Sequence, residues 1–252
     1  MDVWFESGAM PYAQDHYPFE NKEKFECGFP ADFIIEYTGQ LRGWFYSLHV
    51  LATALKKKPA FKNVVVTGVL AGTDGRKMSK SFGNFPDPRH TIEKYGAEAL
   101  RLYFMSNKIM MGEDTSFSED ELREAYAVLN ILHNSHKYLV TYANLHGWTP
   151  EDKVSSNPLD VWITARTEQF IKNYSSSLDE FDLVSSSREI RPFVEDLSTW
   201  YIRRSRDRFA SGDTDALETL HSALVRFSKA VAPTIPFSAD AIYKSLTRST
   251  RT

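Results

Sequence analysis

The pattern of apolar residues changes near Ser118, and this change constrains the fold more than any other feature. Before it, short apolar segments alternate with loops that contain Gly and Pro, whereas after it long stretches carry apolar residues at helical spacing. A capping box over residues 118–121 opens the second part, and the helical pattern that follows runs to about Ala143. A chain of 252 residues is long enough for two domains. We therefore expect one over residues 1–115 and another over residues 116–252.

The first part contains two apolar segments separated by a helical pattern. Residues 32–37 are typical of a short buried strand, and residues 64–70 form a second run that is rich in β-branched side chains. Strand, helix and strand in this order predict a parallel α/β layer. A further helix is expected over residues 95–105. The apolar stripe of the first helix consists of Leu41, Phe45, Leu48, Ala52 and Leu55.

The second part is expected to be entirely helical. Helical patterns cover residues 159–175, residues 181–209 with a break near Pro192, and residues 213–231, and turns that contain Ser, Pro or Gly join them. The sequence therefore predicts a partial α/β domain followed by an all-α helical bundle.

Composition excludes several classes of protein. Apolar residues make up 42% of the chain and charged residues 25%, which is the balance of an ordinary globular protein, and the net charge of -3 gives no overall attraction for nucleic acid. The single cysteine, Cys27, excludes an intramolecular disulfide and fits a reducing compartment. No apolar run approaches the roughly 20 residues needed to cross a bilayer, and the N-terminus lacks the pattern of a signal peptide. We therefore expect a cytoplasmic protein with no membrane partner.

Two lysines stand in a polar loop directly after the second apolar run. Lys77 and Lys80 are three residues apart, Arg76 precedes them, and glycines lie on both sides. Such a cluster can close on a polyphosphate and neutralise the charge that develops when an α-phosphoryl group is transferred and pyrophosphate leaves. A solvated basic loop is the alternative interpretation of two lysines beside glycines.

The same loop carries the sequence KMSKS over residues 77–81, which resembles the second signature of the class I aminoacyl-tRNA synthetases. The resemblance implies that Lys80 and Ser79 contact ATP, and that Lys77 and Lys80 stabilise the transition state from which pyrophosphate leaves. The carboxylate of the amino acid is then the nucleophile. ATP would be a substrate, and Mg²⁺ is expected with it.

A second segment resembles the isoleucyl branch of this family. The usual pattern there is Glu, then Asp-Gln, then Arg-Gly-Trp-Phe, and residues 36–45 follow it except that Gly39 stands where many members have Asp. The segment lies at the carboxyl end of the first expected strand, where open α/β sheets bind ligands. The resemblance implies that Glu36, Gly39 and Gln40 bind the aminoacyl-adenylate.

Two tryptophans belong to segments that resemble this branch. Trp44 lies in the segment just described, and Trp4 lies in residues 2–8, which resemble the family sequence Asp-Val-Trp-Phe-Asp-Ser-Gly with Glu6 in place of the second Asp. The resemblance implies that Trp4 and Trp44 bind the adenylate by lining the slot for a branched side chain, a contact that suits large flat indoles. The alternative is that both are core aromatics.

Four arginines fall within six positions in the segment over residues 200–209, which lies at the end of an expected helix. We predict that Arg203, Arg204 and Arg206 bind tRNA, because arginines at helical spacing can follow a phosphate backbone. The alternative is a charged helix face whose arginines form salt bridges to Glu195 or Asp196. The segment resembles the helical anticodon-binding domain of the isoleucyl, valyl and leucyl group, as do residues 230–237, and in that group the basic block is partly structural.

The histidines predict no metal site. His133 and His136 share a helix face, but no third candidate ligand lies near them in the sequence.

The resemblance covers almost the whole chain but only the later part of a synthetase. The family's ATP-binding His-x-Gly-His motif does not occur, and nothing resembles an editing domain. We therefore expect a fragment of an isoleucine-tRNA ligase that is inactive alone, with residues 1–115 as the end of a Rossmann-like catalytic domain and residues 116–252 as the anticodon-binding domain. Its partners would be isoleucine, ATP, tRNA(Ile) and the missing N-terminal half of a synthetase that is monomeric in the family.

Two alternatives follow from the same residues. The chain could be a standalone tRNA-binding module or regulatory paralogue without ligase activity, or a ligase with valyl or leucyl specificity. An isolated half-sheet should also expose apolar edges, so we expect the α/β part to be marginally stable on its own.

Overall fold

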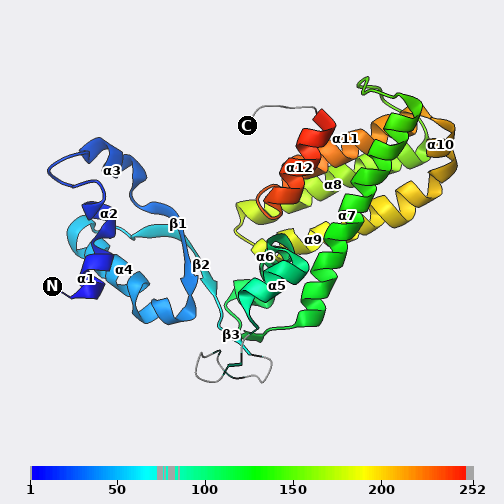
Figure 1. Cartoon of the computed structure of the whole chain (residues 1–252). Helices are drawn as coiled ribbons and strands as arrows, with labels where there is room; N and C mark the ends of the chain where they lie inside the picture. Colours follow the sequence, from blue (N-terminus) through cyan, green and yellow to red (C-terminus); the bar gives the residue numbers. More distant parts are fainter. Residues whose placement is uncertain (1, 73–75, 77, 79–82, 85, 248–252) are drawn as a thin grey trace. The chain divides into compact units, whose positions relative to one another are not determined.

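The computed structural model describes residues 2–72, 76, 78, 83–84 and 86–247. The chain divides into two compact units (Figure 1), one formed by Met1–Asn84 with Lys108–Phe117 and the other by Phe85–Asn107 with Ser118–Thr252. The chain thus passes between the units more than once, and its last passage lies next to the change of pattern at Ser118. Residues 86–107 belong to the second unit although they precede that change. The domain limits 1–115 and 116–252 stay a prediction.

The first unit combines short helices with two small parallel sheets. Its elements in chain order are α1 (Val3–Gly8), α2 (Met10–Ala13), α3 (Lys22–Gly28), β1 (Ala31–Tyr37), the 3-10 helix η1 (Thr38–Arg42), α4 (Trp44–Lys56), β2 (Phe61–Thr67), β3 (Leu70–Ala71), the 3-10 helix η2 (Lys108–Met111) and β4 (Thr115–Ser116). β1 pairs with β2 in parallel, with Ile34 opposite Val64, and β3 pairs with β4 in parallel. The predicted order of strand, helix and strand with parallel pairing is confirmed.

Helix α4 forms the core of this unit with the sheet. Leu48 and Ala52 of α4 are buried together with Ala60, and Ile34 of β1 packs against them. The expected apolar stripe is wrong at both ends, because Leu41 is 56% exposed and Leu55 is 63% exposed. Leu41 lies in η1, where the turn is tighter and the side chain leaves the face that α4 buries. Leu55 lies in the last turn of α4, beyond the buried cluster.

Strand β1 is less buried than expected. Phe33, Ile35 and Tyr37 are 49%, 42% and 38% exposed, and they alternate with Ile34, which packs toward α4. Residues that alternate along a strand point to opposite faces of the sheet. One face of β1 is therefore covered by α4 and the other is open within this unit.

The second unit is built from helices. Its elements are α5 (Pro88–Tyr95), α6 (Ala97–Met105), α7 (Glu119–His146), α8 (Pro158–Asp179), α9 (Leu183–Glu195), the π-helix η3 (Asp196–Ile202), α10 (Arg206–Ser211), α11 (Thr214–Val231) and α12 (Pro236–Thr247). Among the described residues after Ser118, no strand occurs, as the sequence predicts. Half of the expected capping box is present: the Ser118 side chain accepts a hydrogen bond from the Glu121 amide at the start of α7, whereas the Ser118 amide donates to the hydroxyl of Tyr103. No described helix combines the length and the apolar character that crossing a membrane requires.

The prediction of one helix over residues 181–209 with a break near Pro192 is wrong. Pro192 lies inside α9, and the regular helix gives way later, at the π-helix η3, which is followed by a turn at Ser205 and by α10. Proline has no N–H to donate to the preceding turn, and wider turns are one way in which a helix accommodates such a loss.

Helix α6 is fixed to the turn between α11 and α12. The carboxylate of Glu98 accepts hydrogen bonds from the amides of Phe237 and Ser238, at 2.8 and 3.1 Å, where α12 begins. Arg101, one helical turn further along α6, donates to the carbonyl oxygens of Pro233 and Thr234, at 2.8 and 2.9 Å. These contacts explain why α6 packs with helices that lie far along the sequence.

Candidate functional site

The two sequence segments that contain Trp4 and Trp44 meet in the first unit, where α1 packs against α4. A Cβ atom added at Gly8 would lie 2.9 Å from the carbonyl carbon of Ser47, so the two backbones approach too closely for a side chain. The indole Nε1 of Trp44 donates to the carbonyl oxygen of Ser7, at 3.2 Å. These contacts place both tryptophans at one junction.

Gly43 lies at the centre of this junction. A Cβ atom there would lie 2.9 Å from the six-membered ring of Trp4 and 2.7 Å from Oε1 of Gln40. Gln40 Oε1 also accepts a hydrogen bond from the Trp44 amide, at 3.0 Å, and so satisfies one of the free N–H groups at the start of α4. Trp4 keeps 50% of its surface exposed. Trp4, Gln40, Gly43 and Trp44 therefore form one cluster with an accessible indole.

Glu36 and Gly39 lie at the end of β1 and in η1, directly before Gln40 in the chain. Glu36 is exposed, and its Oε2 accepts from the Tyr37 amide at 2.7 Å. A Cβ atom at Gly39 would lie 2.4 Å from the ring of Tyr37, so any side chain at this position requires the ring to move. An exposed carboxylate at a strand end can accept hydrogen bonds from an ammonium or from hydroxyl groups.

The predicted ATP-binding residues Lys77, Ser79 and Lys80 lie outside the described residues. The base of their loop is described. The Gly72 amide donates to the carbonyl oxygen of Arg76, at 2.8 Å, and a Cβ atom at Gly72 would lie 2.1 Å from the carbonyl oxygen of Asn84. Residues on the two sides of the KMSKS sequence thus approach each other directly after β3.

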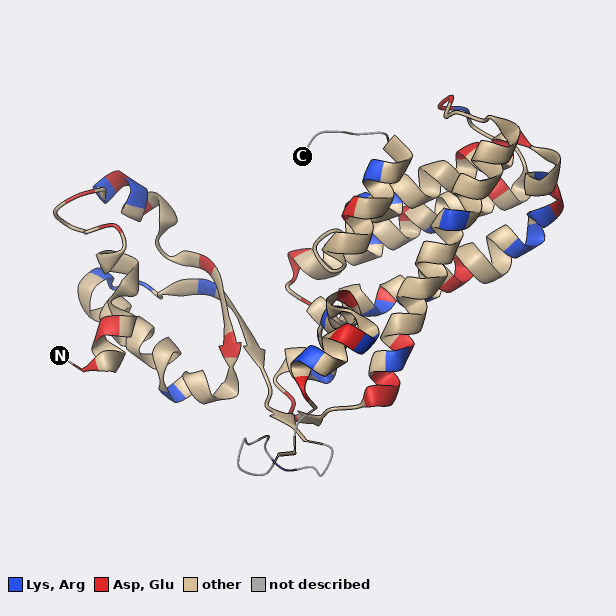
Figure 2. Cartoon of the chain, viewed as in Figure 1, with Lys and Arg blue, Asp and Glu red and all other residues tan. Residues whose placement is uncertain are grey.

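The second unit carries the predicted tRNA-binding arginines. Arg203, Arg204 and Arg206 are exposed, and Figure 2 shows basic residues in this turn between α9 and α11. Among the described residues, no carboxylate lies within ion-pair distance of these three side chains, whose charge is therefore available to a ligand. The guanidinium of Arg204 lies over the ring of Trp200, 3.7 Å from its centroid.

The fourth arginine of the segment is structural. Arg208 donates to both carboxylate oxygens of the buried Asp160 and, through Nε, to Asp213 at 2.7 Å. The hydrogen bonds that Arg208 donates to these carboxylates, those to Asp160 most of all, raise its pKa above the ordinary value. No local pattern around Arg208 indicates this network, because Asp160 lies 48 residues away.

The salt bridges expected for the basic segment have different partners. Glu195 pairs with Arg191 at 3.0 Å, and Asp196 pairs with Arg166 at 2.8 Å. The alternative in which these two carboxylates neutralise the arginines after Trp200 is therefore wrong.

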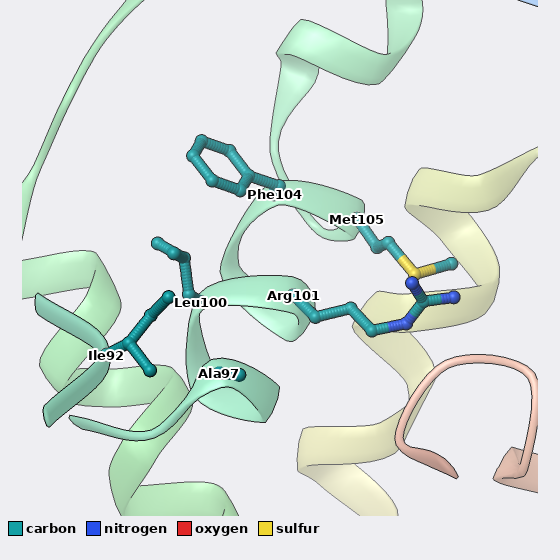
Figure 3. A pocket seen from close by; sticks show the side chains of 6 residues that line it. All are labelled: Ile92, Ala97, Leu100, Arg101, Phe104 and Met105. Atoms are coloured by element: carbon teal, nitrogen blue, oxygen red, sulfur yellow. The ribbon is translucent and has the colours of Figure 1, made fainter. Parts of the chain in front are cut away.

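An apolar pocket beside α6 offers no reactive groups. Figure 3 shows it lined by Ile92, Ala97, Leu100, Arg101, Phe104 and Met105. Arg101 is the charged side chain in this lining, and its guanidinium already donates to the two carbonyl oxygens before α12. Within the described part of the chain, no three His, Cys, Asp or Glu residues are grouped so that they could hold a metal ion.

Both units match known proteins. Residues 1–118 match the family described as tRNA synthetases class I (I, L, M and V), and residues 160–252 match the anticodon-binding domain of tRNA ligase. The chain is 42% identical to the isoleucine-tRNA ligase of Treponema denticola and 45% identical to that of Nocardia farcinica, over 98% of its length in each case. The chain belongs to the class I tRNA synthetases.

The chain of this class I synthetase spans 24% of the length of each of these two relatives. Two solved structures share its fold. A LeuRS from Agrobacterium radiobacter, solved in a ternary complex with tRNA and LeuAMS, has a TM-score of 0.74 and 15% identity over 100% of this chain and 32% of its own. The methionyl-tRNA synthetase of Mycobacterium tuberculosis, solved with methionyl-adenylate, has a TM-score of 0.75 and 19% identity over 95% of this chain and 49% of its own.

Within this class I synthetase chain, the candidate residues divide between the two matched regions. The cluster of Trp4, Gln40 and Trp44, and the KMSKS sequence, fall in the region that matches the synthetase family, whereas the exposed arginines fall in the region that matches the anticodon-binding domain.

Proposed function

We propose that this chain is part of an isoleucine-tRNA ligase, which activates isoleucine with ATP and transfers it to tRNA(Ile). The observation that carries the proposal is the cluster at the end of β1, where Trp4, Gln40, Gly43 and Trp44 meet. The relatives that bear the name isoleucine-tRNA ligase support the choice of amino acid.

Each residue of the cluster has a proposed task. The indoles of Trp4 and Trp44 line the slot for the branched side chain, since large apolar rings suit an alkyl group. Gln40 keeps its side-chain oxygen on the Trp44 amide, which leaves its amide nitrogen to donate to the adenylate. Glu36 accepts hydrogen bonds from the ammonium or the ribose, and the missing side chain at Gly39 leaves room for the Tyr37 ring.

The reaction itself needs no protein nucleophile. The carboxylate of isoleucine attacks the α-phosphorus of ATP, a new phosphorus–oxygen bond forms, and pyrophosphate leaves with the electron pair. Lys77 and Lys80 neutralise the charge that develops on the phosphates, and Ser79 contacts ATP beside them. Mg²⁺ is expected to accompany the nucleotide, and it takes most of its ligands from phosphate and water.

We further propose that residues 1–115 are part of a Rossmann-like catalytic domain and that residues 116–252 are a helical anticodon-binding domain. The open face of β1 supports this, because parallel strands are normally covered on both faces. The remaining part of a synthetase polypeptide, which would carry the His-x-Gly-His motif, would cover that face and supply the rest of the ATP site. The complete enzyme would act as a monomer in the cytoplasm, and this chain alone would be inactive.

A chimaera tests the proposed reaction. This chain would replace the matching segment of the Nocardia farcinica relative, and isoleucine-dependent pyrophosphate exchange would be measured. Lys80→Ala should lower the exchange rate by roughly two orders of magnitude or more, as loss of one transition-state contact does. Lys58→Ala, which removes an exposed lysine outside the loop, is the matched control. A wild-type rate for Lys80→Ala would remove Lys80 from the mechanism.

The amino-acid slot is tested separately. Trp44→Ala in the same chimaera should raise the KM for isoleucine, because it removes one wall of the slot. An unchanged KM would refute the slot. Aminoacylation with isoleucine, valine and leucine in turn would decide the specificity, although a missing methylene changes discrimination by only about 1–3 kcal/mol, for which this enzyme family is the standard example.

A second candidate function is a standalone tRNA-binding module or regulatory paralogue. The exposed charges of Arg203, Arg204 and Arg206 favour it, because binding through them needs no ATP site. tRNA binding by the chain, together with a chimaera that fails to activate any amino acid, would support this second candidate over the first.

A further inference from the structure

We propose that Lys56 positions the indole of Trp4 against that of Trp44 and so fixes the width of the slot for the isoleucine side chain. Lys56 lies at the far end of α4 from Trp44, and it acts through the segment that carries Trp4 rather than by contact with the amino acid. This inference rests on the proposed function and adds a residue outside the slot on which the choice of amino acid depends.

Helix α4 is held at both of its ends by residues 3–17, which we call the arm. Figure 1 shows α1, the start of this arm, beside α4. At the first residue of α4, the indole Nε1 of Trp44 donates to the carbonyl oxygen of Ser7, at 3.2 Å. At the last residue, the ammonium of Lys56 donates to the hydroxyl of Tyr17. Because α4 has 13 residues, these two attachments lie about 18 Å apart along its axis.

Two stacked aromatic rings hold the ammonium of Lys56. Nζ lies 4.1 Å from the ring centroid of Tyr17 and 4.8 Å from that of Phe25, and the two rings stack with 4.1 Å between their centroids. Lys56 is half-buried, and within the described part of the chain no carboxylate lies within ion-pair distance of it. A cation–π contact strengthens when water is partly removed from the cation. These rings therefore fix the arm to the end of α4.

The arm is hydrogen-bonded along its length. The Ala9 amide donates to the carbonyl oxygen of Phe5 in α1, at 2.9 Å, and the Ala9 carbonyl oxygen accepts from the Ala13 amide in α2, at 3.0 Å. The Tyr17 amide then donates to the carbonyl oxygen of Tyr12, at 3.0 Å. Hydrogen-bonded turns of this kind move as one body, so a displacement at Tyr17 is passed on to α1.

Helix α1 depends on both attachments for its position. It has only six residues, too few for a stable helix on its own. Trp4 is 50% exposed, and its ring approaches the backbone at Gly43, where no side chain is present. Without Lys56, α1 keeps its contacts with the start of α4 but is free to turn about them. The separation between the indoles of Trp4 and Trp44 is then no longer fixed.

A slot whose walls move discriminates less between amino acids. Isoleucine and valine differ by one methylene, and a pocket gains from that methylene only where its walls fit it closely. Loss of the Lys56 contact should therefore weaken binding of isoleucine more than binding of valine. The KM for ATP should stay the same, because the arm carries no residue that is proposed to contact ATP.

Pyrophosphate exchange in the chimaera tests the proposal. Lys56→Met keeps the length of the side chain but removes its cation. It should raise the KM for isoleucine by about threefold to tenfold, which corresponds to the loss of one cation–π contact, and leave kcat unchanged. The ratio of kcat/KM for isoleucine to that for valine should fall. Lys56→Arg should restore the unmodified values, because a guanidinium makes the same contact. Lys58→Met, at an exposed position just beyond α4, is the matched control.

The same assay separates positioning from stability. If Lys56 only supports the fold, Lys56→Met lowers the amount of active enzyme, so that kcat falls and the KM for isoleucine is unchanged; that result would overturn the proposal. Tyr17→Leu should raise the KM for isoleucine as Lys56→Met does. The double variant should raise it no further, because both changes remove one contact. Additive effects would show that Lys56 does not act through Tyr17.

Hydrogen exchange on the full chain tests the attachment without any activity. Amides of residues 3–9 should exchange faster in Lys56→Met than in the unmodified chain, whereas Lys58→Met should match the unmodified chain. Unchanged exchange in Lys56→Met would overturn the positioning role. Faster exchange together with a chimaera that activates no amino acid would overturn the proposed function but keep the attachment of α1 through Lys56.

Discussion

Arg208 and Asp160 form a bidentate ion pair in the second unit, with 2.7 Å between Nη1 and Oδ1 and 2.6 Å between Nη2 and Oδ2. The Asp160 carboxylate also accepts from the hydroxyl of Tyr201, at 2.8 Å, and the same arginine reaches Asp213. This pair joins the start of α8 to α10. This structural role distinguishes Arg208 from Arg203, Arg204 and Arg206, whose side chains are exposed.

Removing the arginine should expose how much this pair contributes to stability. Arg208→Ala leaves a buried carboxylate without its partner and should lower the free energy of unfolding by about 3–5 kcal/mol. Arg208→Lys should recover little of this lost stability, because an ammonium cannot bind both oxygens of Asp160 and also Asp213 in the same geometry. Urea unfolding followed by far-UV circular dichroism measures the change.

The control for this prediction is an exposed pair. Arg123→Ala removes a contact to Asp120 on the surface of α7 and should lower the free energy of unfolding far less than Arg208→Ala does, because solvent screens exposed ion pairs. Equal losses for Arg208→Ala and Arg123→Ala would contradict the structural role of Arg208.

Glu98 should be needed to hold α12 in place. Glu98→Ala leaves the amides of Phe237 and of the buried Ser238 without acceptors and should lower the free energy of unfolding by about 2–4 kcal/mol. Exchange of the Ser238 amide hydrogen should also become faster. Glu93→Ala, at an exposed position on α5, is the control, and comparable exchange rates in the two variants would argue against this role.

Two glycine variants test how closely α1 and α4 pack. Gly8→Ala places a methyl group 2.8 Å from Cβ of Ser47 and should destabilise the first unit by about 1–3 kcal/mol. In Gly28→Ala, in α3, the new methyl group has no atom within 4 Å. This variant should leave the free energy of unfolding unchanged or raise it by up to about 1 kcal/mol through helix propensity. Hydrogen exchange along α4, read by mass spectrometry, distinguishes them, and identical protection would show that the close approach is absent in solution.

The contact between α7 and α12 should weaken in acid. His136 Nε2 hydrogen-bonds with the hydroxyl of Ser245 at 2.9 Å, and burial, with a smaller effect of the charge on His133, lowers the pKa of His136 below its ordinary value. The unfolded chain then binds a proton at His136 more readily than the folded chain does. The contribution of the neutral His136 side chain to the stability of the fold is therefore complete above the ordinary pKa of about 6.5, and it is lost as the pH falls below that value.

Thermal unfolding at about pH 7 and pH 5 would measure this effect. His136→Gln, which keeps a hydrogen-bonding group but cannot be protonated, should show a smaller loss of midpoint temperature on acidification than the unmodified chain. His90→Gln, at an exposed position, should behave like the unmodified chain. The prediction is wrong if His136→Gln loses as much as the unmodified chain does.

Local patterns were sufficient to predict much of the fold. The spacing of apolar residues predicted the strand, helix and strand of the first unit, and the box at Ser118 predicted the start of α7. Both rest on interactions between residues close in sequence. The extent of burial was not predictable in the same way, because the open face of β1 depends on what packs against it and not on the residues of the strand.

Contacts between residues far apart in the sequence could not be predicted from local patterns. Nothing near Arg208 indicates that its partner is Asp160 while Arg204 lies on a tryptophan, since both belong to one short basic segment and only the turn at Ser205 places them in different helical segments. For the candidate site, the sequence pointed to Gln40 and Trp44 at a strand end. The contact of Trp4 with Gly43 joins two segments whose proximity only the folded chain reveals.

The hydrogen bonds between Glu98 of α6 and the start of α12 impose an order on the folding of the second unit during synthesis. Glu98 lies 139 and 140 residues before the two amides that satisfy it, so α6 emerges from the ribosome long before α12 has been translated. Until then its carboxylate stays hydrated, because burying an unpaired charge is strongly unfavourable. The second unit therefore cannot close progressively from its first helix onward, and the last helix to be made is the one that completes it.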